Sequence, residues 1–263
     1  MIDLHVHTSF SFDSNESAEN YVYEAKKRGV NAIGFSEHYD YDALMDGANI
    51  TVTDLFEYTQ NIGRLRAEND SFKILCGVEF GYRDFAVPHY RELIERYDFD
   101  YVINSVHTLA GRGDCFHDKF FEGKTLKESY ADYLLAVLES VKADFDFQII
   151  GHLGYVSRYR NHVKLEYKDF SDILDEILRE IIKRDKCLEI NSSTGTSGSE
   201  FLPDTDIILR YLQLGGRLLS YGSDAHSVEK YGKRSAQTIE FLKSACVKEL
   251  YYYEKRRPIG YKI

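Results

Sequence analysis

The sequence predicts an α/β fold in which a parallel sheet closes into a barrel, and three observations lead to this fold class. Short apolar, β-rich segments alternate with longer segments of helical period along the chain. Neighbouring parallel strands need a crossover connection, which the intervening helices supply. Histidines and carboxylates gather at the ends of the predicted strands. Because all strand ends meet at one mouth only in a closed barrel, this placement favours a barrel over an open doubly wound sheet.

Length and composition fit one domain with a substantial core. The chain has 263 residues, of which 43% are apolar and 29% charged, and only 3 prolines, which leaves little material for a linker. α/β barrels of this length commonly form one domain. We therefore expect a single domain over residues 1–263.

Seven short segments are predicted to be strands because each is apolar and rich in β-forming residues. No glycine-rich loop of the GxGxxG or GxxxxGK[ST] kind follows any of them, so nucleotide-binding forms of the open sheet lose support. The predicted strands cover residues 2–7, 32–36, 73–80, 101–107, 147–152, 187–192 and 217–222.

The segments between these strands carry helical patterns. Residues 18–28 have an apolar stripe and a basic last turn that suits the helix dipole, and Gly29 follows as a stop signal. Apolar residues recur at i, i+3 and i+4 over 130–141 and again over 170–182. A membrane-surface or partner-binding face is possible for these stripes, but we expect faces packed on the core.

The C-terminal part of the chain is predicted to hold two further helices and a tail. Pro203, followed by acidic residues, predicts the first turn of one helix, and residues 235–247 form the other. The tail 251–263 is too short for a domain. Its basic and aromatic residues would permit nucleic-acid contact, but we expect a solvated tail whose tyrosines pack on the body.

Composition disfavours several classes of function. The net charge of −10 disfavours a surface that binds a phosphate backbone. The apolar runs are far shorter than the ~20 residues of a membrane span, and the N-terminus lacks the features of a signal peptide. Four cysteines without CxxC spacing fit reduced thiols. We therefore expect a cytoplasmic protein that binds neither nucleic acid nor membrane, with its oligomeric state left open.

His5 and His7 are the first candidate site residues. They lie at i and i+2 of the first predicted strand, so both side chains leave the same face. Asp3 shares that face and is expected to orient an imidazole from behind. Short HxH pairs also occur by chance, but two imidazoles pointing together rarely form a satisfied core arrangement. Metal binding explains the pair more economically.

Further histidines and carboxylates lie at or just beyond predicted strand ends, where the mouth of a barrel gathers catalytic groups. We expect the three other histidines, His89, His117 and His162, at the surface or on the substrate side. The predicted metal ligands are His5, His7, His38, His107, His152 and His226 together with Glu79 and Asp224.

Eight nitrogen and oxygen ligands are too many for one ion, because a catalytic zinc uses about three protein ligands plus water. Imidazole and carboxylate ligands without thiolate suit Zn, Mn or Fe. The sequence therefore predicts two to three divalent ions, with Glu79 able to bridge two of them. Such a cluster clamps phosphoryl oxygens and lowers the pKa of a bound water.

An ordered set of motifs resembles the polymerase-and-histidinol-phosphatase (PHP) superfamily, and within it the monofunctional histidinol-phosphate phosphatases of bacterial histidine biosynthesis. The motifs are DLHVHTSFSFDS, FSEH, GVEF, NSVHT, IIGHL and YGSDAHS. The resemblance spans Asp3 to about Ser227 and implies a distorted, TIM-like (β/α)7 barrel with a trinuclear metal centre. It adds Asp13 to the eight ligands above, although Asp13 could also cap the helix that begins nearby.

The resemblance also implies a substrate phosphate held by an arginine after the fifth strand. Arg158 is the matching position, and Arg160 is a neighbour of similar reach; an arginine fork pairs with phosphate oxygens. The sequence departs from the family pattern after the sixth strand, where EINSSTGTSGSE has no arginine. Small polar residues such as Ser193 are expected to bind phosphate through hydroxyl and backbone N–H groups instead.

The implied reaction is hydrolysis of L-histidinol phosphate by a metal-activated hydroxide. Arg158 would neutralise charge on the phosphoryl group, and Asp13 and His226 are candidates for proton donation to the leaving oxygen. If the family division of ligands applies, Asp13, His38 and His226 hold the third ion.

Other functions remain compatible with the same residues. The site could accept another small phosphomonoester, such as a nucleotide or sugar phosphate. An amidohydrolase-type C–N hydrolase commonly uses a carbamylated lysine, and no lysine occupies a predicted strand end. The acidic charge disfavours a proofreading exonuclease. A metal-storage or sensory site would take up metal without turnover.

Overall fold

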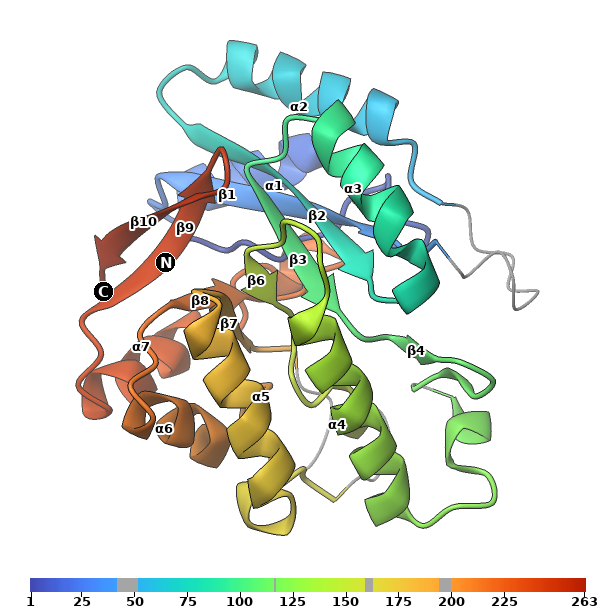
Figure 1. The fold of residues 1–263 in the computed structure, drawn as a ribbon. Helices are drawn as coiled ribbons and strands as arrows, with labels where there is room; N and C mark the ends of the chain where they lie inside the picture. Colours follow the sequence, from blue (N-terminus) through green and yellow to red (C-terminus); the bar gives the residue numbers. More distant parts are fainter. Residues whose placement is uncertain (42–51, 116, 159–162, 194–199) are drawn as a thin grey trace.

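A curled parallel sheet of six strands forms the centre of the protein, and seven helices accompany it in the part of the chain that the structure describes (Figure 1). The structure is a computed structural model, and it describes residues 1–41, 52–115, 117–158, 163–193 and 200–263. The sheet order is β1-β2-β3-β6-β7-β8. Its strands are β1 (Ala32–Tyr39), β2 (Lys73–Gly81), β3 (Tyr101–Ser105), β6 (Ile149–Ile150), β7 (Cys187–Asn191) and β8 (Leu219–Gly222).

Helices and strands alternate along the chain as the sequence predicts. The helices are α1 (Ala18–Lys27), α2 (Leu55–Glu68), α3 (Val87–Arg96), α4 (Leu126–Lys142), α5 (Ser171–Lys183), α6 (Thr205–Gln213) and α7 (Ser235–Ser244). Two small antiparallel pairs complete the described strands, β4 (Thr108–Leu109) with β5 (Gly113–Asp114) and β9 (Glu249–Glu254) with β10 (Arg257–Lys262). The predicted α/β class with a parallel sheet is confirmed.

The first predicted strand differs from the other six. Residues 2–7 form isolated bridges, Asp3 with Ile33 and Val6 with Ala225, rather than a regular strand. The backbone is nevertheless bonded on both sides. The N–H of Leu4 donates to the carbonyl of Tyr221 at 3.0 Å, and the N–H of Ser36 donates to the carbonyl of Val6 at 3.0 Å. The segment therefore lies between the two edge strands of the sheet, β1 and β8.

Strand bounds also shift where site residues lie. β1 continues three residues beyond the predicted segment 32–36, so His38 lies within the strand. β6 covers only two residues of the predicted segment 147–152, so His152 follows the strand end. β1 is therefore longer than predicted at its carboxyl end, and β6 is shorter than predicted at both ends.

Helix starts and stops follow local chemistry. Ser17 caps α1 by accepting the N–H of Asn20, and the predicted stripe of this helix is buried. Thr125 and Glu128 form a capping box at the start of α4. The last helix ends at Ser244 rather than at residue 247, because Cys246 takes a left-handed conformation with φ of 61°.

The prediction that Pro203 begins a helix is wrong by two residues. α6 begins at Thr205, and Asp204 occupies the N-cap position. Pro203 precedes the cap and contributes no helical turn. The acidic residue Asp206 lies in the first turn, as the helix dipole favours.

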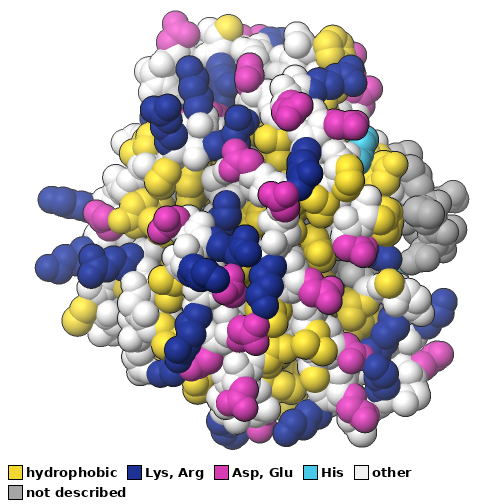
Figure 2. Space-filling view, viewed as in Figure 1, with side chains coloured by type: hydrophobic (Ala, Val, Ile, Leu, Met, Phe, Trp, Pro, Cys, Tyr) yellow, Lys and Arg dark blue, Asp and Glu magenta, His cyan; other side chains and the backbone are white. Residues whose placement is uncertain are grey.

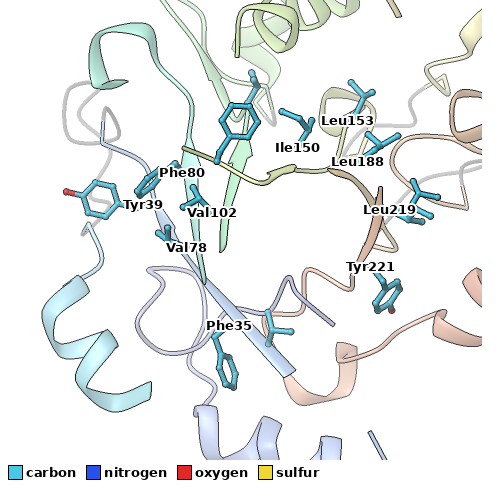
Figure 3. Packing of buried hydrophobic residues seen from close by; sticks show 14 of the residues in the cluster. Phe35, Tyr39, Val78, Phe80, Val102, Ile150, Leu153, Leu188, Leu219 and Tyr221 are labelled. Carbon is cyan, nitrogen blue, oxygen red and sulfur yellow. The ribbon is translucent and has the colours of Figure 1, made fainter. Parts of the chain in front are cut away.

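Apolar side chains form two layers on either side of the curled sheet. The larger layer fills the space between sheet and helices, and Figure 3 shows residues of several strands in this layer, such as Phe35 of β1, Val102 of β3 and Leu188 of β7. The smaller layer lies inside the curl. Its buried members are Leu4, Leu75, Tyr101, Ile103, Ile149, Cys187 and Tyr253.

Tyr101 shapes the inner layer. Its hydroxyl donates to the carbonyls of Leu4 at 2.6 Å and Phe35 at 3.0 Å, which ties the N-terminal segment to β1. The ring lies so close to the β2 backbone that a Cβ at Gly77 would come within 2.3 Å of it. Glycine is therefore required at this position.

The C-terminal tail is a β-hairpin, which corrects the expectation of a solvated tail. Lys255 and Arg256 have φ of 49° and 62°, as a type I′ turn requires. The expected packing of tyrosines on the body holds for Tyr253, which is 2% exposed and belongs to the inner layer. Asp100, at the start of β3, accepts the N–H of Lys255 at 3.0 Å. The hairpin thus covers the amino-terminal ends of the strands.

The surface and the cysteines agree with the composition. On the face shown in Figure 2, Lys and Arg are interspersed with Asp and Glu among the described residues, without a continuous basic band. None of the described helices combines the length and the apolarity that crossing a membrane requires. Cys76, Cys115 and Cys187 are buried free thiols, and Cys246 is an exposed one.

Candidate metal centre

The predicted ligands converge at the carboxyl-terminal ends of the strands, opposite the β9–β10 hairpin. His5 and His7 come from the N-terminal segment between the two sheet edges. Asp13 lies in the loop before α1. The other six lie on a strand or within four residues of its end: His38 on β1, Glu79 on β2, His107 after β3, His152 after β6, and Asp224 and His226 after β8.

Glu79 lies at the centre of this cluster. Its Oε2 is 3.2 Å from His5 Nε2 and 2.8 Å from His38 Nδ1. Its Oε1 is 2.9 Å from His152 Nε2 and 3.3 Å from His107 Nε2. The two carboxylate oxygens therefore face different pairs of imidazoles, as a bridging ligand requires.

Two further carboxylates extend the cluster. Asp224 Oδ1 is 3.3 Å from His7 Nε2 and 3.9 Å from His5 Nε2. Asp13 Oδ2 is 3.0 Å from His226 Nε2 and 3.6 Å from His38 Nε2. The Asp13 side chain is 37% exposed, so it forms the outer rim of the cluster.

The donor set fits divalent cations. Within the described part of the chain, four converging atoms are buried without a hydrogen bond of acceptable geometry: His5 Nε2, His7 Nε2, His38 Nδ1 and Glu79 Oε2. Buried polar atoms in proteins rarely lack a hydrogen-bond partner. Four groups of three residues each place ligand atoms within 4.8 Å of one another: His7, His38 and His226; His5, Glu79 and His152; His5, His7 and Asp224; His38, Glu79 and His107.

The electrostatics of the metal-free site leave some ligands ready for a cation and others protonated. Burial opposes the charge of His5 and His107, but the carboxylates beside them raise the pKa of both rings well above the usual value, so a cation must displace a proton from each. Burial opposes the charge of Glu79, but the neighbouring His5, His107 and His38 hold its pKa well below the usual range. Burial, with His38 and His226 nearby, holds the pKa of His7 well below the usual value, so this ring is neutral. A carboxylate and a neutral imidazole are the forms that bind a cation.

A ring of supporting groups around the ligands was not predicted. Asp40 Oδ1 lies 2.8 Å from His107 Nδ1. Glu37 accepts hydrogen bonds from Thr8 and Ser11 and so fixes the loop after His7. Asp40 lies two residues after His38, and a same-face argument would have found it.

The predicted role of Asp3 is wrong. Asp3 Oδ1 accepts the backbone N–H groups of His5 at 3.2 Å and Ser223 at 2.9 Å, and does not contact an imidazole. Burial raises its pKa to about 6. The carboxylate behind His5 is Glu189, with Oε1 2.6 Å from Nδ1. The contact joins residues 184 positions apart, so periodicity along the first strand could not indicate it.

Comparison with known proteins identifies the family. A model of the PHP domain matches residues 3–193. The chain belongs to the PHP domain family. The histidinol-phosphatase of Lactococcus lactis subsp. lactis (strain IL1403) is 32% identical over 232 residues, which cover 87% of this chain and 85% of that protein. A probable histidinol-phosphatase of Clostridium acetobutylicum is 28% identical, over 97% of this chain and 98% of that one.

Solved structures share the fold of this chain. The histidinol phosphate phosphatase of L. lactis, complexed with zinc, L-histidinol and phosphate, has a TM-score of 0.87 at 29% identity and covers 98% of each chain. A structure from Listeria monocytogenes has a TM-score of 0.74 at 20% identity, over 90% of this chain and 99% of that one, and supports the fold alone.

The predicted substrate residues of this PHP protein differ in their surroundings. Arg158 is 5% exposed and forms an ion pair with Asp224. Its Nη2 also donates to Asn191 Oδ1 at 3.2 Å. Ser193 donates its backbone N–H to the same Asn191 oxygen at 2.9 Å. Arg160 lies outside the described residues.

The three histidines left out of the predicted ligand set do not join it among the described residues. His89 lies on α3, and its Nε2 is 2.8 Å from the Tyr39 hydroxyl. His117 precedes a short 3-10 helix, Asp118–Phe121. His162 lies outside the described residues.

Proposed function

We propose that this protein is a metal-dependent phosphomonoesterase that hydrolyses L-histidinol phosphate to L-histidinol and phosphate. The observation that carries the proposal is the convergence of the imidazoles and carboxylates around Glu79. Four of the converging nitrogen and oxygen atoms are buried without a hydrogen bond of acceptable geometry. The similarity to histidinol-phosphatases over nearly the whole chain supports the substrate.

We also propose that the sheet and the N-terminal segment together form a barrel, which brings the ligands together. Residues 2–7 act as the first strand of a distorted (β/α)7 barrel, in one domain over residues 1–263. The hydrogen bonds of Leu4 and Val6 to opposite edges of the sheet support this strand count.

The centre would hold two to three divalent ions, Zn, Mn or Fe. Glu79 would bridge, with His5, His7, His107, His152 and Asp224 around it, and Asp13, His38 and His226 would hold the third ion. When bound, such ions polarise phosphoryl oxygens and lower the pKa of water. The distances of Asp13 to His226 and His38 support the third group.

The remaining roles belong to the chain's own side chains. Arg158 holds Asp224 through Nη2 and, as a guanidinium has five donors, also pairs with a phosphate oxygen. Arg160 and Ser193 extend the phosphate contacts. Asp13 and His226 adjoin at the exposed rim, so we assign to this pair the passage of a proton to the leaving oxygen. Burial opposes the charge of Asp13, but His226 and His38 hold its pKa well below the usual range, so its carboxylate accepts and orients the proton.

A panel of phosphomonoesters tests the substrate. We expect kcat/KM for L-histidinol phosphate to exceed that for nucleotide and sugar phosphates by at least tenfold. Equal values would contradict the specific substrate and favour another small phosphomonoester. The segment EINSSTGTSGSE has no arginine, and this departure from the family pattern is the reason for including other phosphomonoesters in the panel.

The variant His107→Ala separates catalysis from metal storage. We expect it to lose turnover while its circular dichroism spectrum is unchanged, since His107 Nε2 faces Glu79 at 3.3 Å and His107 lies beyond the end of β3 rather than within the strand. Metal uptake by the unaltered protein without any phosphate release would instead indicate a storage or sensory site.

A further inference from the structure

Among the strands of the described sheet, β7 contributes none of the nine predicted ligands. It carries Glu189 and Asn191 at i and i+2, which point to the same side of the sheet. Both are buried, Glu189 at 1% exposure. Two buried polar side chains on an otherwise apolar strand need partners, and the structure provides them among the predicted ligands.

The Glu189 carboxylate joins two ligands. Its Oε1 lies 2.6 Å from His5 Nδ1. Its Oε2 accepts the backbone N–H of His152 at 2.6 Å and a side-chain N–H of Asn191 at 3.2 Å. With Nδ1 donating to the carboxylate, Nε2 is the His5 atom that remains to bind a cation, and it is the atom that faces Glu79.

Asn191 carries the connection onward. Its amide nitrogen lies 3.3 Å from Asp224 Oδ2, while Asp224 Oδ1 faces His7 and His5. Its amide oxygen accepts from Arg158 at 3.2 Å. The two residues of β7 therefore stand behind His5, His152 and Asp224 together.

The fold makes room for this contact. A Cβ at Gly222 of β8 would lie 2.1 Å from Glu189 Oε1 and 2.5 Å from His5 Cβ. Only a glycine at this position allows the carboxylate and the imidazole to meet. The backbone of β8 is thus fitted to the Glu189–His5 contact.

We propose that Glu189 is a positioning residue, which fixes the tautomer and orientation of His5 for metal binding, and that Asn191 couples it to Asp224. The proposal rests on the metal centre of the proposed function. In metal sites, loss of a group behind a ligand typically weakens metal affinity about 10- to 100-fold.

The test measures Zn²⁺ affinity of the metal-free protein by competition with a chelating dye, without any turnover. We expect Glu189→Gln to weaken the tightest Zn²⁺ site about 10- to 100-fold. Glu189→Asp, which keeps the charge but retracts the carboxylate, should lie between it and the unaltered protein. If Glu189→Gln folds poorly, Glu189→Asp still measures the effect of Glu189 on Zn²⁺ affinity.

The matched control is Asp100→Asn. Asp100 is also a buried carboxylate that accepts backbone N–H groups, from Cys76 at 2.9 Å and Lys255 at 3.0 Å, but at the opposite strand ends. The Asp100→Asn substitution should lower the melting temperature and leave the Zn²⁺ affinity unchanged. In parallel, long-range ¹H–¹⁵N spectra of the Zn²⁺-loaded protein should show His5 protonated at Nδ1 and bound through Nε2, and a shifted His5 Nδ1 signal in Glu189→Gln but not in Asp100→Asn.

The outcomes distinguish this proposal from the proposed function. Unchanged Zn²⁺ affinity in folded Glu189→Gln and Glu189→Asp would overturn the positioning role and leave the metal centre intact. Equal loss in Asp100→Asn would also overturn it, because the effect would then reflect stability alone. Absence of Zn²⁺ binding in the unaltered protein would overturn both proposals.

Discussion

Single residues set the spacing inside the curled sheet. Tyr101 fills the inner layer below the candidate metal centre, and its hydroxyl bonds two backbone carbonyls. Gly77 provides the space for its ring. Because interiors are packed to the density of organic crystals, one added methyl group there must displace a neighbour.

The pair Gly77→Ala and Gly63→Ala tests this packing. At Gly77 the new Cβ lies within 2.3 Å of the Tyr101 ring, and we expect a loss of about 1–3 kcal/mol in the free energy of unfolding. At Gly63, inside α2, nothing lies within 4 Å of a Cβ, and we expect a gain of about 0.4–1 kcal/mol. Urea denaturation measures the free energy of unfolding of both variants. A Gly77→Ala variant as stable as the unaltered protein would contradict the packing described.

At the same scale, the sequence predicted the residues of the candidate site better than their partners. A histidine or acid after an apolar run marks a strand end, which suffices for His38, Glu79, His107 and His152. The partner across the sheet depends on how the sheet curls. Periodicity therefore could not show that Glu189 supports His5 or that Arg158 pairs with Asp224.

At the scale of elements, the C-terminal hairpin is the main difference from the sequence-based prediction. A basic, tyrosine-rich segment has the composition of a solvated tail. The segment has a residue that can be buried, Tyr253, but the sequence does not show that the inner apolar layer is open to solvent at the amino-terminal strand ends. The hairpin can be predicted only once that opening is known. Tyr253 covers that opening, and Asp100 fastens the turn by accepting the N–H of Lys255.

Tyr253→Ala tests the hairpin. Removing a fully buried aromatic side chain typically costs about 3–5 kcal/mol, so we expect a large drop in the free energy of unfolding. Tyr23→Ala, at a side chain that is 71% exposed on α1, should change it by less than about 0.5 kcal/mol. Since the hairpin lies opposite the candidate metal centre, Zn²⁺ affinity should be unchanged in the folded fraction of both variants. A similar stability of the two variants would contradict the role of Tyr253.

The same scale shows why strand bounds were only partly predictable. β1 continues through Glu37 and His38 because its backbone pairs with β2 as far as Tyr39 and Phe80. Polar side chains there are tolerated because they face other polar groups rather than apolar core. A sequence pattern that ends a strand at the first charged residue stops too early at such a site.

At the scale of the whole molecule, polarity changes along the inside of the curled sheet. The amino-terminal ends hold the apolar inner layer, and the carboxyl-terminal ends hold the imidazoles and carboxylates. The net charge of −10 therefore includes buried acids that divalent ions would neutralise. An acidic chain can thereby accept an anionic phosphate ester at one end.

The most direct test titrates Zn²⁺ into protein stripped of metal by a chelator and measures phosphate release from L-histidinol phosphate. We predict no turnover in the stripped protein and a rise to a plateau at two to three equivalents of Zn²⁺ per chain. The melting temperature should rise in parallel, since a ligand at 100 times its Kd stabilises the folded state by about 2.7 kcal/mol. Full activity in the stripped protein, or a plateau below two equivalents, would contradict the account.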